Sequence, residues 1–317
     1  MMIRSNTPAL CLVFLAALAG QAAANVPTPE TLPAVTDPSL ASPSERAENR
    51  ESSAPASPAA AALRDKLSAF PTEGNAQEIK ESAVLVDFYD ARASSPLWVT
   101  QKGLTPEAAT IIDEIKKADE WGLEAKDFAL PELATHTEDG PDLSPEEIAE
   151  AELTLSQAIL KYARYVRGGR IIDPTILLNS NLDRKPQLLD PQTVLEGITR
   201  SEAPDAYLRG VHPQHPQFEK LRQAYLKTRS KATKMKLRAN IEHWRWMPDD
   251  IGELHILANV PEFIVRVVKK GEVIHKERIV VGEVNKQTTI YTRPLKSIVF
   301  KPTWRVPESI KVRELWP

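Results

Sequence analysis

Cysteine is nearly missing from this chain of 317 residues, in which Cys11 is the only one. A single thiol excludes a disulfide scaffold, a zinc site built from cysteines and an iron–sulfur cluster. A strong excess of charge is missing too, because 40 basic and 43 acidic residues leave a formal net charge of −3. This balance argues against a nucleic-acid binder, which usually carries a strongly basic face. The mean hydropathy of −0.32 excludes a polytopic membrane protein.

Several motifs of catalysis and metal binding are also missing from the sequence. It contains no G-x-S-x-G turn, no H-E-x-x-H pair and no P-loop. His212 and His215 have a spacing that two metal ligands can use, but Pro213 and Pro216 oppose the helix that would bring them together. We therefore expect neither a metal nor a cofactor.

Residues 1–24 have the three parts of a secretory signal peptide. Arg4 supplies the positive charge, residues 9–20 (ALCLVFLAALAG) are apolar, and small residues end the segment at Ala24. The apolar run is too short for an ordinary transmembrane helix. Cleavage near Ala24 would give a periplasmic protein with no thiol and no membrane span. The alternative is an uncleaved membrane anchor.

Residues 25–60 are dominated by proline, alanine and serine and contain no aromatic side chain. Such a segment cannot bury enough apolar area to offset the entropy lost on ordering. We expect a disordered linker, which either holds the folded part away from the membrane or is a spacer without a partner.

Apolar residues recur at helical spacing between residues 61 and 239, which predicts an all-helical domain. Two helices have clear starts, one at Thr105-Pro106 and one at Ser144-Pro145, where Glu147 can complete a capping box. Further helices are expected over residues 76–89, 191–198 and 217–226. The buried stripes of the first two are expected to be Ile111, Ile112, Ile115 and Ala118, ending at Gly122, and Ile148, Ala151, Leu155, Ile159, Tyr162 and Val166.

Strand-like patterns replace the helical period near residue 250. Residues 254–260, 262–268, 273–282 and 297–304 predict successive strands, with a turn at residues 269–272. Phe263, Val265 and Val267 are expected on one face. The predicted fold class is therefore α+β. So few strands leave exposed edges and an uncovered apolar face, so we expect this strand-rich domain to be incomplete.

A basic stretch precedes the strands. Residues 220–238 contain eight basic residues and no acidic one. This stretch is either an electrostatic handle for acidic polymers or anionic lipid, or a solvated helix face and linker. Aromatic residues interleaved with the charges, which single-stranded nucleic acid requires, are missing apart from Tyr225.

Four short stretches share motifs with one family. Residues 240–248 (NIEHWRWMP) are similar to N-x-E-R-W-R-W-x-P, and residues 258–263 (ANVPEF) to V-N-I-P-x-F. Residues 279–282 (IVVG) are similar to V-V-G, and residues 300–310 (FKPTWRVPESI) to F-N-P-x-W-x-V-P-x-S-I. With weaker matches upstream, the chain resembles the large, exported murein L,D-transpeptidases, the YcbB-like group with a YkuD catalytic fold. The resemblance covers roughly residues 66–317.

The signature positions of this resemblance are mostly aromatic. Two tryptophans around an arginine suit packing at a domain interface, with the guanidinium stacked on a ring, and carbohydrate or peptide stacking is the alternative. His243, Lys301 and Arg305 depart from the family pattern. The signature residues, expected to be structural, are Trp244, Arg245, Trp246, Trp304 and Pro307.

The resemblance implies an α+β protein with a helical scaffold over residues 61–239 and the N-terminal part of a catalytic domain over residues 240–317. It also implies the chemistry of the L,D-transpeptidases, in which a cysteine thiolate attacks a peptidoglycan stem peptide, D-Ala is released, and the acyl group passes to an amine. That step forms 3–3 cross-links or attaches proteins to stems. The chain lacks the motif with the catalytic histidine and S-H-G-C-x-R, so we expect no catalytic residue in it and no activity. The alternative is a non-catalytic periplasmic module that binds peptidoglycan or a protein partner.

Overall fold

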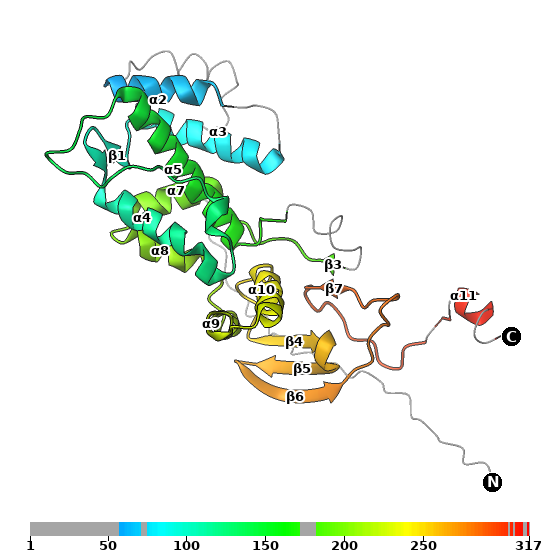
Figure 1. Cartoon of the computed structure of the whole chain (residues 1–317). Helices are drawn as coiled ribbons and strands as arrows, with labels where there is room; N and C mark the ends of the chain where they lie inside the picture. Colours follow the sequence, from blue (N-terminus) through cyan, green and yellow to red (C-terminus); the bar gives the residue numbers. More distant parts are fainter. Residues whose placement is uncertain are drawn as a thin grey trace, which may run out of the picture. The chain divides into compact units, whose positions relative to one another are not determined.

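The computed structural model describes residues 57–70, 75–171, 182–303, 305, 306, 308–312 and 316 (Figure 1). Within these residues helices come first and a small antiparallel sheet follows, which makes the fold class α+β, as predicted. The described residues up to Thr292 belong to one compact unit, and those from Arg293 on belong to another, which contains the short helix α11 (Glu308–Ile310). The helices of the first unit are α2 (Pro58–Ser68), α3 (Ala76–Asp90), α4 (Pro106–Lys116), α5 (Pro145–Val166), α7 (Pro191–Arg200), α8 (Pro204–Val211), α9 (Pro216–Lys227) and α10 (Lys231–Arg245).

Proline begins most of these helices, because its fixed φ suits the first helical position. An N–H group at that position would have no partner within the helix, so proline loses no hydrogen bond there. The capping box predicted for α5 is confirmed: the Ser144 hydroxyl accepts from the Glu147 amide at 3.2 Å, and the Glu147 carboxylate accepts from the Ser144 amide at 2.8 Å. Thr105 caps α4 in the same way, by accepting from the amide of Ala108 at 3.1 Å. Helices α2, α8 and α10 were not individually predicted from the sequence.

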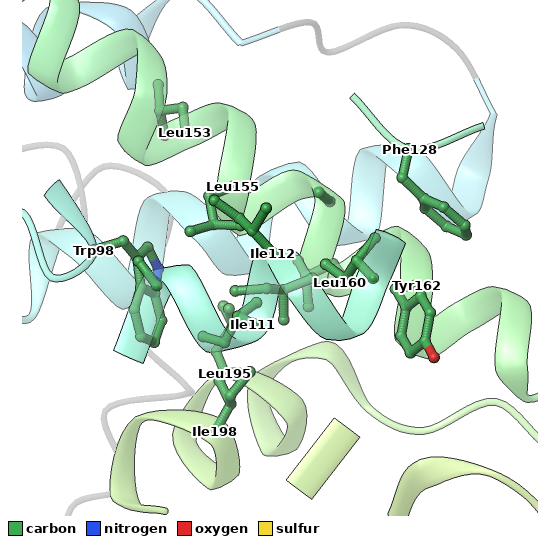
Figure 2. Packing of buried hydrophobic residues seen from close by; sticks show 14 of the residues in the cluster. Trp98, Ile111, Ile112, Phe128, Leu153, Leu155, Leu160, Tyr162, Leu195 and Ile198 are labelled. Carbon is green, nitrogen blue, oxygen red and sulfur yellow. The ribbon is translucent and has the colours of Figure 1, made fainter. Parts of the chain in front are cut away.

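One hydrophobic core joins helices α2 to α8. The stripes predicted for α4 and α5 are buried within it. Figure 2 shows Ile112 of α4 beside Leu155 of α5, and Leu195 and Ile198 of α7 packing beside Ile111. Helix α5 contributes the largest share of this core.

A buried carboxylate on α5 holds the loop that follows α3. Glu152 is fully buried and accepts from the backbone amides of Leu97 (2.7 Å), Trp98 (2.8 Å) and Val99 (3.1 Å). It also accepts from the Tyr89 hydroxyl at 2.6 Å. Burial raises the pKa of Glu152 to about 7, and the four donors act against that rise. The carboxylate therefore serves as the hydrogen-bond acceptor of three backbone amides, a role that carbonyl oxygens fill in regular secondary structure.

The sheet consists of β4 (Leu254–Asn259), β5 (Ile264–Lys269) and β6 (Glu272–Arg278), paired in sequence order. The predicted turn between β5 and β6 is confirmed: Lys270 (φ 51°) and Gly271 (φ 81°) both have positive φ, as a two-residue hairpin turn of type I′ requires.

Two strand predictions were wrong in part, and a third was wrong over all of its described residues. Pro261 lies in a 3-10 turn (Val260–Glu262), which leaves Phe263 at φ 57° and outside β5, so it does not continue the face of Val265 and Val267. Strand β6 ends at Arg278, and residues 279–282 form no strand. The described residues of 297–304 form no strand either; nearby, β7 (Ile290–Tyr291) pairs in parallel with β3 (Leu182–Asp183).

The region predicted to be all-helical also contains a small hairpin, β1 (Val99–Thr100) and β2 (Gly103–Leu104). This hairpin requires glycine at position 103. The φ of Gly103 is +127°, which other residues rarely adopt, and a Cβ there would clash with the Ala134 carbonyl oxygen at 2.6 Å. Two predicted boundaries also meet helices. Helix α2 begins at Pro58, inside the predicted linker, and residue 240, the predicted start of the second domain, lies within α10. The predicted signal peptide and the rest of the linker up to residue 56 lie outside the described residues.

Candidate functional site at the end of helix α10

The signature tryptophans and arginine lie where α10 ends. Trp244 and Arg245 belong to its last turn, and Trp246 is its C-cap residue. The other two signature residues, Trp304 and Pro307, lie outside the described residues, so their predicted role is untested. We call the surroundings of Arg245 the α10 junction, which comprises Trp121, Tyr162, Val166, Gly168, His212, Phe218, Arg245 and Trp246.

Arg245 is the centre of the α10 junction, and its side chain is fully buried. Its guanidinium donates to the carbonyl oxygen of Trp121 at 2.6 Å and to that of Val166 at 2.9 Å. It also lies 5.5 Å from the ring centroid of Phe218. Burial lowers the pKa of Arg245 to about 10, and the nearby carboxylate of Glu242 opposes that shift. The guanidinium is therefore charged at neutral pH.

His212 lies against this guanidinium. Its Nε2 is 2.9 Å from the Tyr162 hydroxyl, its Nδ1 is 3.5 Å from an Arg245 nitrogen, and its ring stacks on Trp121 at a centroid distance of 3.9 Å. Burial, with the charge of Arg245 as the second cause, lowers the pKa of His212 well below its ordinary value. The imidazole is therefore neutral. We assign the proton to Nε2, which donates to Tyr162, because Nδ1 faces a cation that has no lone pair to offer.

Trp246 closes the junction against the end of α5. Gly168 lies there with a φ of +84°, and a Cβ at this position would lie 2.2 Å from Cδ1 of Trp246. The indole is buried and thus packs directly on the glycine backbone. Next to it, Arg167 forms a two-point ion pair with Asp249, with nitrogen-to-oxygen distances of 2.8 and 2.5 Å. These contacts tie the segment after α10 to the segment after α5.

His212 and His215, whose spacing was considered for metal binding and judged against it, have other roles. His212 is the C-cap residue of α8 and is engaged through both ring nitrogens. His215 is the N-cap residue of α9, where its Nδ1 accepts from the Gln217 amide at 3.1 Å, and its ring stacks on Trp244 at 4.5 Å. The described residues contain no group of three or more histidine, cysteine or acidic side chains that could hold a metal ion.

The α10 junction packs the ends of α5, α8 and α10 together, which is a structural role. Tyr162, His212 and Arg245 are fully or almost fully buried, the Arg245 guanidinium donates to two backbone carbonyls, and the Tyr162 hydroxyl is bonded to His212. The indole Nε1 of Trp246 is buried with no hydrogen-bond partner among the described residues. Sequence reasoning found Trp244, Arg245 and Trp246, but it missed Glu152 and did not place His212 beside Arg245. Glu152 had a detectable signal, because a glutamate interrupts the apolar face that continues from Ile148 to Leu155 on α5.

Comparison with known proteins supports part of the resemblance. A family model described as Scaffold domain matches residues 83–224, from within α3 to within α9. None of the curated proteins matches the chain. Among the described residues, none of the helices combines the length and the apolar character needed to cross a membrane. The Scaffold domain is the N-terminal domain of L,D-transpeptidases, so over residues 83–224 this chain is similar to that domain.

Proposed function

We propose that this chain is the scaffold portion of a peptidoglycan L,D-transpeptidase system in the periplasm. The single observation that carries the proposal is the Scaffold-domain match over residues 83–224. The motif similarity of residues 240–248 to the entry of the catalytic domain supports it, because this segment is packed into the helical unit through Arg245.

The chemistry of such a system requires a thiolate. An L,D-transpeptidase cysteine attacks the carbonyl carbon of a stem peptide, D-Ala leaves with a proton, and an amine then displaces the thiolate. A thiol needs a nearby base or cation for activation, and the oxyanion needs donors. The sole cysteine of the printed sequence is Cys11, within the predicted signal peptide. We propose that the 317-residue polypeptide binds peptidoglycan or a transpeptidase domain and does not itself form an acyl-enzyme.

Covalent labelling tests this proposal. Carbapenems acylate the cysteine of L,D-transpeptidases, so intact-mass analysis of the purified chain after incubation with a carbapenem reports an acyl-enzyme directly. We expect no adduct on the chain. The matched control is Cys11→Ser, because any adduct on the unprocessed chain that disappears in this variant belongs to the leader. An adduct that persists in Cys11→Ser would mean that another side chain carries the acyl group, and the proposal would be wrong.

Co-sedimentation with purified sacculi tests the scaffold role separately. We expect the chain to bind peptidoglycan or to associate with a cysteine-containing transpeptidase domain without being acylated. Binding of sacculi alone, with no effect on such a domain, would favour the alternative of a periplasmic binding module.

A further inference from the structure

The hairpin of α9 and α10 carries a concentration of unpaired positive charge at its tip. The two helices are joined by residues 228–230 and pack against each other, as Figure 1 shows. Phe218, Tyr225 and Ile241 form the apolar contact between α9 and α10. The outward side of the tip is built from exposed residues, which we call the basic tip: Leu226, Lys227, Arg229, Lys231, Lys234, Met235 and Lys236.

The cations of the basic tip have no carboxylate partner among the described residues. Arg222 and Arg238, by contrast, are neutralised, the first by Glu219 at 2.8 Å and the second by Glu124 at 2.6 Å. Lys234 lies 4.8 Å from the ring centroid of Tyr225, a contact that holds the ammonium at the surface and leaves its charge uncompensated. The surface potential here is therefore positive in a chain whose net charge is −3.

Two large apolar side chains lie among these cations. Met235 is 66% exposed and Leu226 is 43% exposed, and both lie on regular helices. On α10, Lys231, Lys234 and Met235 are spaced at i, i+3 and i+4, so they share one helix face. Leu226 and Lys227 are the last two residues of α9, and Lys234 of α10 lies over the ring of Tyr225, which precedes them. Lysines that surround exposed Leu and Met side chains are typical of surfaces that dock on a lipid interface.

We propose that the basic tip docks on an anionic phospholipid bilayer. The lysines and arginine would lie at the level of the phosphates, and Met235 and Leu226 would enter the boundary between headgroups and acyl chains. Charge complementarity favours an anionic bilayer over a neutral one, and the two apolar side chains favour a bilayer over a soluble polyanion, which offers no apolar phase. This inference does not depend on acyl transfer, so it can fail while the proposed function stands.

Vesicle co-sedimentation of the full chain tests the inference at low ionic strength. Residues 9–20 are apolar and would bind any bilayer, so the readout is binding to vesicles of phosphatidylglycerol and phosphatidylethanolamine minus binding to vesicles of phosphatidylcholine. We expect Lys231→Glu combined with Lys234→Glu to lower this difference in affinity by about tenfold or more. Glutamate is favourable in the first turn of α10, so the fold is retained. The matched control, Lys116→Glu with Lys276→Glu, makes the same change of charge at other exposed positions and should bind nearly as the unchanged protein does.

A second variant separates lipid from other polyanions. We expect Leu226→Ser with Met235→Ser to lower the affinity for anionic vesicles several-fold and to leave binding to soluble polyaspartate unchanged. Equal loss on both partners, or vesicle binding that the serine variant retains in full, would overturn the lipid assignment in favour of an anionic polymer. An absence of selective binding to anionic vesicles, or equal loss in the Lys116/Lys276 control, would overturn the docking role altogether.

Discussion

The contact between Gly168 and Trp246 gives a prediction whose size follows from the geometry. Gly168 has a φ of +84°, and a Cβ would lie 2.2 Å from Cδ1 and 2.3 Å from Nε1 of the buried Trp246 ring. Gly168→Ala therefore has two costs. A left-handed backbone costs an alanine about 1 to 2 kcal/mol, and forcing a methyl group against a packed ring costs about 1 to 3 kcal/mol more.

Gly122→Ala is the matched control. Gly122 has a φ of +76°, but a Cβ there would meet its nearest side-chain atoms at 3.7 Å, an ordinary contact. Gly122→Ala should therefore lower the free energy of unfolding only by the cost of the left-handed backbone, about 1 to 2 kcal/mol. Urea unfolding followed by far-UV circular dichroism measures both free energies of unfolding, provided that the slope with urea stays the same. The excess for Gly168→Ala over Gly122→Ala, about 1 to 3 kcal/mol, is the contribution of Trp246.

A double variant makes the test sharper. Trp246→Ala removes the ring and is itself strongly destabilising, but in that background Gly168→Ala should cost no more than Gly122→Ala does, because the obstructing atoms are gone. If Gly168→Ala costs as little as Gly122→Ala in the unchanged protein, the packing of Trp246 on the glycine backbone is refuted.

The other predictions concern buried polar groups. Glu152→Gln should cost about 2 to 4 kcal/mol in chemical denaturation, because an amide NH2 cannot accept from the backbone amides that the carboxylate holds, whereas the exposed Glu150→Gln should cost about 1 kcal/mol or less. Arg245→Met should cost about 3 kcal/mol or more, because two carbonyl oxygens lose their donor, and an unchanged denaturation midpoint would contradict the anchoring role. The folded-state pKa of His212 lies below its ordinary value of 6.5, so the unfolded chain takes up the proton more readily and stability should fall as the pH drops below 6.5. His212→Gln should flatten that acid-side decline in the free energy of unfolding, and because Glu152 titrates in both proteins, the difference between the two curves isolates His212.

The helix starts and buried stripes were predictable because their causes are local. Ser144, Pro145 and Glu147 specify the beginning of α5 within four residues, and apolar spacing specifies its buried face. The α10 junction was only partly predictable. The W-R-W pattern marked Arg245, but the partners of its guanidinium come from Trp121 and Val166, far away in the sequence.

The errors arose where distant contacts or an isolated proline override the local pattern. The alternation around Phe263 favours a strand, but Pro261 imposes a 3-10 turn first. The pairing of Leu182–Asp183 with Ile290–Tyr291 joins segments more than a hundred residues apart, which no local spacing encodes. The sequence was a better guide at His212 and His215, where Pro213 and Pro216 predicted that no single helix carries both rings: His212 is the C-cap residue of α8 and His215 is the N-cap residue of α9.

The order of the groups around Arg245 has a consequence for synthesis on the ribosome. Both carbonyl acceptors of its guanidinium, and the imidazole beside it, precede residue 245 in the sequence. During synthesis, α2 to α8 therefore leave the ribosome before Arg245 does. Until Arg245 is available, the carbonyl oxygens of Trp121 and Val166 lack its guanidinium as a donor. We expect the last turn of α10 to join the helical unit after the core of α2 to α8 has formed, because Arg245 is synthesised after the groups that it contacts.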